Sequence, residues 1–158
     1  MRREIAWAVL ACVLGVTTGT ETAQGGDGIA GRWLTEDRKG VVDIAPCGAS
    51  ICGRLDWIYQ PMRHGAPTLD EENPNPALRN RRLCGVIMLY DFHRDPSDPR
   101  HWEGGYIYDP ESGHTYHAEI TVVDSEHLRL RGYVMVPLFG ESQTWTRPVT
   151  NHPKCQAA

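Results

Sequence analysis

Apolar and polar side chains alternate with a period of two along most of the chain after residue 30, and helical periodicity is nearly absent. Ala118, Ile120 and Val122, for example, share one face of an extended segment, and Glu119 and Thr121 share the opposite face. Because successive side chains of a β-strand point to opposite faces, this pattern predicts strands with one dry and one wet face.

The alternating segments and the turn-forming residues between them predict eight strands. These cover residues 31–36, 41–47, 52–59, 84–93, 101–108, 115–123, 127–136 and 142–148. Eight antiparallel strands joined mostly by short hairpins favour an all-β fold, a single small up-and-down barrel, with a two-sheet β-sandwich as the alternative. In the seventh strand the pattern puts Leu128, Leu130, Val134 and Val136 on the dry face.

Segment 60–82 interrupts the strands, with four prolines and the acidic cluster 70–72. A loop of this length inside a small domain is often a lid or a binding segment, and a plain surface excursion is the alternative.

The N-terminus has the pattern of an export signal: two arginines, an apolar stretch from Ile5 to about Val16, and a small polar segment. We expect a signal peptide over 1–23, cut between 19 and 24, and a β-barrel domain over 24–158. Lipid attachment to Cys12 is a minority alternative. The apolar stretch is too short to span a bilayer, so we expect no transmembrane segment in the mature protein.

The chain carries 16 basic and 20 acidic residues, a formal net charge of −4, and the expected cleavage leaves this balance unchanged. A mildly acidic chain without a basic tract is a poor candidate for binding nucleic acid or anionic membranes.

Four cysteines remain after export, and an even number in an oxidising compartment indicates disulfides. Cys47 and Cys52 flank a four-residue spacer in a strand-turn-strand pattern, which predicts a bridge across a hairpin and leaves Cys84 to pair with Cys155. The spacing does not suit a zinc site, and we expect no metal.

With these residues in view, the sequence resembles a bacterial exported family catalogued as domain of unknown function 2147. The resemblance rests on GRWLTED (31–37), VDIAPCG (42–48), ICGRLDW (51–57), NPNP (73–76), WEGGYIYDP (102–110) and QTWTR (143–147). It implies a lipocalin-like barrel in the bacterial envelope, in the periplasm or secreted, with no established activity.

A second resemblance is to lipocalins, which open their first strand with Gly-x-Trp and place an arginine of the last strand over that tryptophan. Gly31, Trp33 and Arg147 look like this arrangement, which implies that the guanidinium packs on the indole at the closed end of the barrel.

Candidate catalytic chemistry is weak. The seven histidines lack the spacing of a ligand set, and no serine or cysteine has the setting of a nucleophile. We therefore expect no catalytic residues and no cofactor, and the sequence favours a non-enzyme without deciding the question.

The aromatic residues give a better functional indication, because a barrel of eight strands has room for packed side chains or for one small ligand. The candidate pocket residues are Trp57, Tyr90, Tyr106, Tyr108, Tyr116 and Tyr133. A small apolar or amphipathic ligand is the leading hypothesis. An envelope module that recognises a protein or the cell wall through segment 60–82 is the second, and a carbohydrate-active hydrolase is the third; the sequence identifies no protein partner.

Overall fold

The computed structural model describes residues 28–155, so the expected signal peptide 1–23 and Cys12 lie outside the described residues. Ten strands and two short 3-10 helices follow one another within residues 28–155. They are β1 Gly31–Leu34, β2 Gly40–Cys47, β3 Ser50–Ile58, β4 Met62–Arg63, β5 Ala66–Pro67, η1 Pro76–Leu78, β6 Ile87–Arg94, β7 His101–Asp109, β8 His114–Val122, β9 His127–Tyr133, η2 Pro137–Phe139 and β10 Gly140–Thr146.

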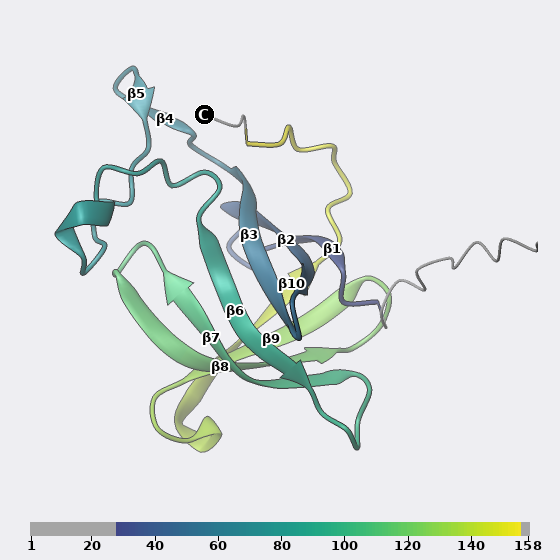
Figure 1. Cartoon of the computed structure of the whole chain (residues 1–158). Coiled ribbons are helices and arrows are strands. Elements are labelled where there is room, and N and C mark those ends of the chain that lie inside the picture. Colours follow the sequence, from purple (N-terminus) through teal and green to yellow (C-terminus); the bar gives the residue numbers. More distant parts are fainter. Residues whose placement is uncertain (1–27, 156–158) are drawn as a thin grey trace, which may run out of the picture.

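Eight of these strands form one closed antiparallel barrel in the order β1-β10-β9-β8-β7-β6-β3-β2, and β4 and β5 pair separately (Figure 1). The barrel closes where Leu34 of β1 pairs with Thr146 of β10. The predicted all-β barrel is therefore confirmed, and each of its eight strands has a paired neighbour on both sides, unlike the edge strands of the sandwich alternative.

The inner face of the barrel carries the hydrophobic core. Trp33, Phe92 and Trp145 are the largest fully buried side chains. The ring of Phe92 lies against the backbone of Gly105, where an added Cβ would come within 2.3 Å of the ring. A large ring on β6 and a missing side chain on the paired strand β7 thus fill the interior together.

Strand β9 ends at Tyr133, three residues before the end predicted from alternation. Met135 has a φ of 70° and Pro137 has no backbone N–H, and both features stop the ladder. The expectation that Val134 and Val136 lie on the dry face is therefore wrong, since both side chains are exposed.

The two predicted disulfides are present, Cys47 with Cys52 and Cys84 with Cys155. The hairpin between β2 and β3 is tighter than expected, because Cys47 pairs with Ser50, so the first bridge runs diagonally across the ladder. The second bridge fastens the C-terminal segment, which passes beside β3 (Figure 1) and donates the Cys155 N–H to the Asp56 carbonyl.

Within residues 28–155, no helix is long and apolar enough to cross a membrane.

Candidate functional site: the open end of the barrel

One end of the barrel is closed by Trp33 and Arg147. The guanidinium Cζ lies 3.6 Å from the centroid of the Trp33 ring, and the indole N–H donates to the Ile29 carbonyl at 2.7 Å. Arg147 also donates to the Gly28 carbonyl. Gly31 has a φ of 103°, and a Cβ there would lie 3.0 Å from the guanidinium, so glycine is required for this close approach. The arrangement expected from the lipocalin resemblance is confirmed.

The opposite end is hollow. A cavity of about 720 Å³ opens between the turn β1–β2, the long connection β3–β6 and the turn β7–β8. Leu69 and Leu83 of the β3–β6 connection line it, and the apolar wall within the barrel consists of Leu55, Ile58, Met88, Ile107 and Trp145. Because these side chains come from β3, β6, β7 and β10, the wall is a continuation of the core. A volume of this size suits one small molecule.

The mouth of the cavity is polar and predominantly acidic. Five carboxylates and two basic side chains lie among the lining residues: Asp37, Glu71, Glu72, Asp109, Glu111, Lys39 and Arg63. At neutral pH this set has an excess of three negative charges, so a ligand with a cationic or hydrogen-bond-donating end is favoured at the mouth.

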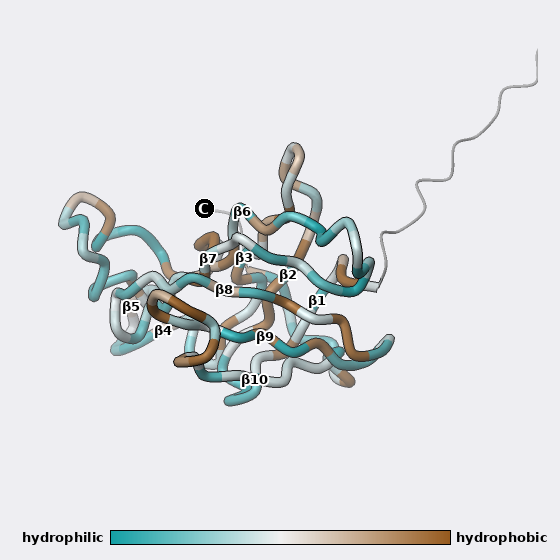
Figure 2. Tube along the Cα trace, turned by 90° about the horizontal axis from the view of Figure 1, so that it is seen from below, coloured by the Kyte–Doolittle hydropathy of each residue, from teal (hydrophilic) through white to brown (hydrophobic). Residues whose placement is uncertain are grey.

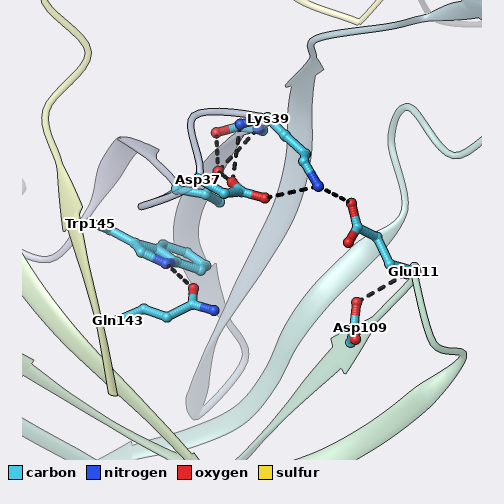
Figure 3. A network of polar contacts seen from close by, with 8 residues as sticks. Asp37, Lys39, Asp109, Glu111, Gln143 and Trp145 are labelled. Carbon is cyan, nitrogen blue, oxygen red and sulfur yellow. Dashed lines mark hydrogen bonds and ion pairs between the residues drawn. The ribbon is translucent and has the colours of Figure 1, made fainter. Parts of the chain in front are cut away.

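Several polar contacts fix the side chains around the mouth (Figure 3). Lys39 Nζ lies 2.6 Å from Glu111 Oε1 and joins the turn β1–β2 to the turn β7–β8, and this hydrogen bond raises the pKa of Lys39. The indole N–H of Trp145 donates to Gln143 Oε1 at 2.9 Å, and the two face the same space as the ion pair. The polar atom of Trp145 is thus satisfied within the cavity wall.

The connection between β3 and β6 completes one side of the mouth, and a buried carboxylate holds it in place. Asp70 is fully buried; its Oδ1 accepts from the Tyr108 hydroxyl at 2.5 Å, and its Oδ2 accepts from Asn73 Nδ2 at 2.8 Å and Arg81 Nε at 2.8 Å. Burial, together with the bond to Asp70, raises the pKa of Tyr108 to about 12. A buried charge persists when it is paired and hydrogen-bonded, so this cluster anchors the loop on the outer face of β7.

Four of the predicted pocket residues, Tyr90, Tyr106, Tyr108 and Tyr133, lie on the outer face of the barrel. Ala118 is buried, so its neighbour His117 points outward, and the cross-strand partners Tyr106 and Tyr133 do the same. Together with Tyr90 they form a row of rings with centroid separations of 5.3, 4.9 and 5.8 Å. These tyrosines do not line the open-end cavity.

The remaining predicted residues are separate from that cavity too. Trp57 packs on His152 of the C-terminal segment, with ring centroids 4.2 Å apart. Tyr116 shares the parity of Ala118 but is not among the lining residues, and Tyr108 is covered by the loop. Tyr90 and Tyr108 do line a smaller groove of about 410 Å³ outside the barrel. The apolar wall of the open-end cavity was not predicted. Alternation shows which side chains point inward, but it does not show which of these are packed and which are accessible to a ligand.

One group of possible metal ligands occurs within residues 28–155: Asp95, His101 and Glu103, whose donor atoms lie within 4.8 Å of one another. The group lies at the β6–β7 turn, far along the barrel from the mouth, and Asp95 Oδ1 already accepts two hydrogen bonds from Ser97. Its ligands are partly exposed side chains of a turn and an adjoining strand, and we make no metal assignment.

Comparison with known proteins agrees with this architecture. A family model described as "Uncharacterized protein conserved in bacteria (DUF2147)" matches residues 31–147. Among solved structures, protein HP1028 from the human pathogen Helicobacter pylori, which belongs to the lipocalin family, is similar with a TM-score of 0.66 and 23% identity. The similarity covers 75% of this chain and 82% of that one, and at this identity it concerns the fold alone. No curated protein sequence matches the chain.

Proposed function

The chain belongs to the bacterial family DUF2147, and from the cavity at the open end of its lipocalin-like barrel we propose that it binds a small amphipathic molecule. The observation that carries the proposal is the division of the cavity into an apolar wall and a polar mouth. An apolar chain fits against Leu55, Ile58, Met88, Ile107 and Trp145, and its polar end remains at the mouth.

The charge of the mouth narrows the ligand class. Because carboxylates outnumber basic groups there, we propose that the polar end is a cation or an uncharged hydrogen-bond donor rather than a carboxylate or phosphate. We also propose that the protein is exported from the cytoplasm. Two disulfides and the sequence of the N-terminus support export to the periplasm or beyond.

The two other functions have less support. An interaction module that acts through segment 60–82 would have to present that loop to a partner, yet Leu69, Glu71 and Glu72 line the cavity and Asp70 fastens the loop to the barrel. For a hydrolase, the mouth offers carboxylates, but Asp109 accepts hydrogen bonds from its own turn at Glu111 and Ser112.

The test uses the neutral amphipathic fluorophore N-phenyl-1-naphthylamine and its displacement by dodecylamine or by laurate. We expect binding that Ile107→Trp abolishes, because the larger side chain fills the cavity. Tyr106→Trp is the matched control, since the neighbouring side chain on the same strand points outward. Unchanged binding in Ile107→Trp would place the probe elsewhere and end the proposal.

The charge class has its own readout. The variant Glu71→Gln/Glu72→Gln should weaken displacement by dodecylamine roughly three- to tenfold and leave N-phenyl-1-naphthylamine binding unchanged, because only the ammonium interacts with the mouth charges. Glu103→Gln, which removes an exposed carboxylate on the outer face of β7, is the control. Tighter binding of laurate than of dodecylamine would contradict the assignment of a cationic or donor end. Native mass spectrometry of protein purified from its native host would then identify a ligand that co-purifies.

A further inference from the structure

The connection between β9 and β10 is an exposed apolar tip, residues 134–139, that the cavity does not use. Met135, Leu138 and Phe139 are 85%, 79% and 77% exposed, and Val134 and Val136 are exposed as well. No charged residue interrupts the run. In Figure 2 the loop that joins β9 to β10, to the left of the β9 label, has the brown colour of apolar residues. Exposed apolar residues that are contiguous mark an interaction site more often than scattered ones do.

The tip is built as a firm projection. The Arg131 guanidinium donates from Nε to the Pro137 carbonyl at 2.6 Å, from Nη2 to the Leu138 carbonyl at 3.3 Å and from Nη1 to Ser142 Oγ at 2.9 Å. At the base, a Cβ on Gly140 would lie 2.5 Å from the Gly132 carbonyl oxygen, so the two strands meet there without room for a side chain.

Part of the backbone of the tip has hydrogen-bond partners within the tip or on Arg131. The carbonyls of Val134 and Val136 accept from the N–H groups of Val136 and Phe139, which adds two satisfied carbonyls to the two bonded by Arg131. Transfer of a loop into an apolar medium is costly mainly because of unsatisfied backbone groups, and these bonds reduce that cost.

The exposure pattern distinguishes between a protein partner and a bilayer. All six consecutive residues 134–139 are exposed, whereas a groove on a protein covers one face of a segment. A bilayer interface accepts apolar side chains all round. Tyr133 is the last residue of β9, directly before the tip, and an aromatic ring at this position suits the headgroup region.

We propose that residues 134–139 insert into the surface of a phospholipid bilayer and dock the barrel there. The net charge of −4 and the acidic mouth argue against electrostatic attraction to anionic lipid, so the binding is apolar and largely independent of salt. The tip lies at the same end of the barrel as the cavity. The strands alternate in direction, so the β9–β10 connection is at the same end as the β1–β2 and β7–β8 turns, which line the cavity. If the proposed ligand binding holds, docking puts the mouth beside the lipid from which an amphipathic ligand would enter.

The experiment is co-sedimentation of the full mature chain, without added ligand, with phosphatidylcholine vesicles at low and high salt. Leu138→Ser/Phe139→Ser should reduce the partition coefficient at least tenfold, since each side chain contributes about one factor of ten when buried. Val149→Ser/Met62→Ser is the matched control, because both side chains are exposed apolar groups elsewhere on the chain. Equal losses in the two double variants, or no sedimentation of the parent, would overturn the proposal.

Two further measurements separate the bilayer from other occupants. Phe139→Trp should retain binding and be quenched by brominated lipid, whereas Val149→Trp should not. Sedimentation velocity should give a monomer; a dimer that Leu138→Ser/Phe139→Ser dissociates would identify the tip as a contact between two copies and overturn bilayer docking. The vesicle assay requires no cavity ligand, so its failure and the failure of the ligand proposal are distinguishable.

Discussion

The guanidinium of Arg147 lies over the ring of Trp33, with 3.6 Å between Cζ and the ring centroid. Arg147 directly follows β10 and Trp33 belongs to β1, so this contact joins the last strand of the barrel to the first. The same guanidinium donates to carbonyls at Gly28 and Arg32, so it also caps the chain that enters β1. Burial lowers the pKa of Arg147, and its hydrogen bonds offset the desolvation penalty of the charged guanidinium.

Removal of this contact should be measurably non-additive. Trp33→Ala should cost about 3 to 5 kcal/mol of unfolding free energy as a core truncation. Its combination with Arg147→Ala should cost less than the sum of the single changes, because each removes the same contact. Arg147→Lys should also destabilise, since an ammonium cannot stack and donate in the same way. Urea denaturation of the four members of the cycle measures this, and strict additivity would contradict the interpretation.

This closed end was predictable from short motifs, and so was the run of strands, because alternation survives wherever a strand has one buried face. The face of the barrel to which each aromatic side chain points was not predictable. In β7, Tyr106 and Tyr108 share one face, but the inner positions are Gly105 and Ile107. Tyr108 lies on the outer face of the barrel, and it is buried there because the loop that Asp70 anchors covers its ring. A buried acid in a proline-rich loop leaves no periodic trace in a sequence.

The end of β9 shows a second limit. Val134 and Val136 continue the alternation of the strand, yet the left-handed backbone at Met135 takes them out of the sheet. Such a conformation in a non-glycine residue depends on the surrounding contacts, here the Arg131 bonds, and these are not visible in the local sequence.

The glycines of the inner face give a sharp test of packing. Gly105→Ala should destabilise the barrel by about 1 to 3 kcal/mol, because the new Cβ would overlap the ring of Phe92, which is 2.3 Å away. Gly132→Ala, two strands along on the same face, should be neutral or slightly stabilising, since its Cβ would lie 3.7 Å from Ile107. Thermal melting of the two variants compares them directly. Equal effects would mean that Phe92 can move aside.

The two disulfides should contribute unequally. Cys84→Ser/Cys155→Ser opens a loop with a sequence separation of 71 and should cost about 4 kcal/mol in the chain-entropy model. Cys47→Ser/Cys52→Ser opens a separation of 5 and should cost about 2 kcal/mol. Denaturation of the oxidised parent and of each double variant gives both values. A larger loss for the Cys47 and Cys52 pair would indicate strain or unfolded-state structure that loop length does not describe.

The anchor of the long loop should be sensitive to alkaline pH. The pKa of Tyr108 is raised from 10.0 to about 12 by burial and by its bond to Asp70. The folded protein therefore keeps this proton between pH 10 and 12 while the unfolded chain releases it. The stability from Tyr108 is complete below pH 10 and declines by roughly 2 to 3 kcal/mol as pH rises to about 12.

Tyr108→Phe isolates this group from the other side chains that titrate in the same range. At pH 8 the variant should be less stable than the parent by about 1 to 3 kcal/mol, because Asp70 Oδ1 loses its donor in a buried site. The difference between the two proteins should then shrink from pH 10 to pH 12, since only the parent has a Tyr108 proton to lose. Urea denaturation at steps of pH gives the difference, with the exposed Tyr59→Phe as the control that should show none of it. A gap between parent and Tyr108→Phe that stays constant up to pH 12 would mean that the Tyr108 hydroxyl titrates normally and that Asp70 holds the loop through Asn73 and Arg81 alone.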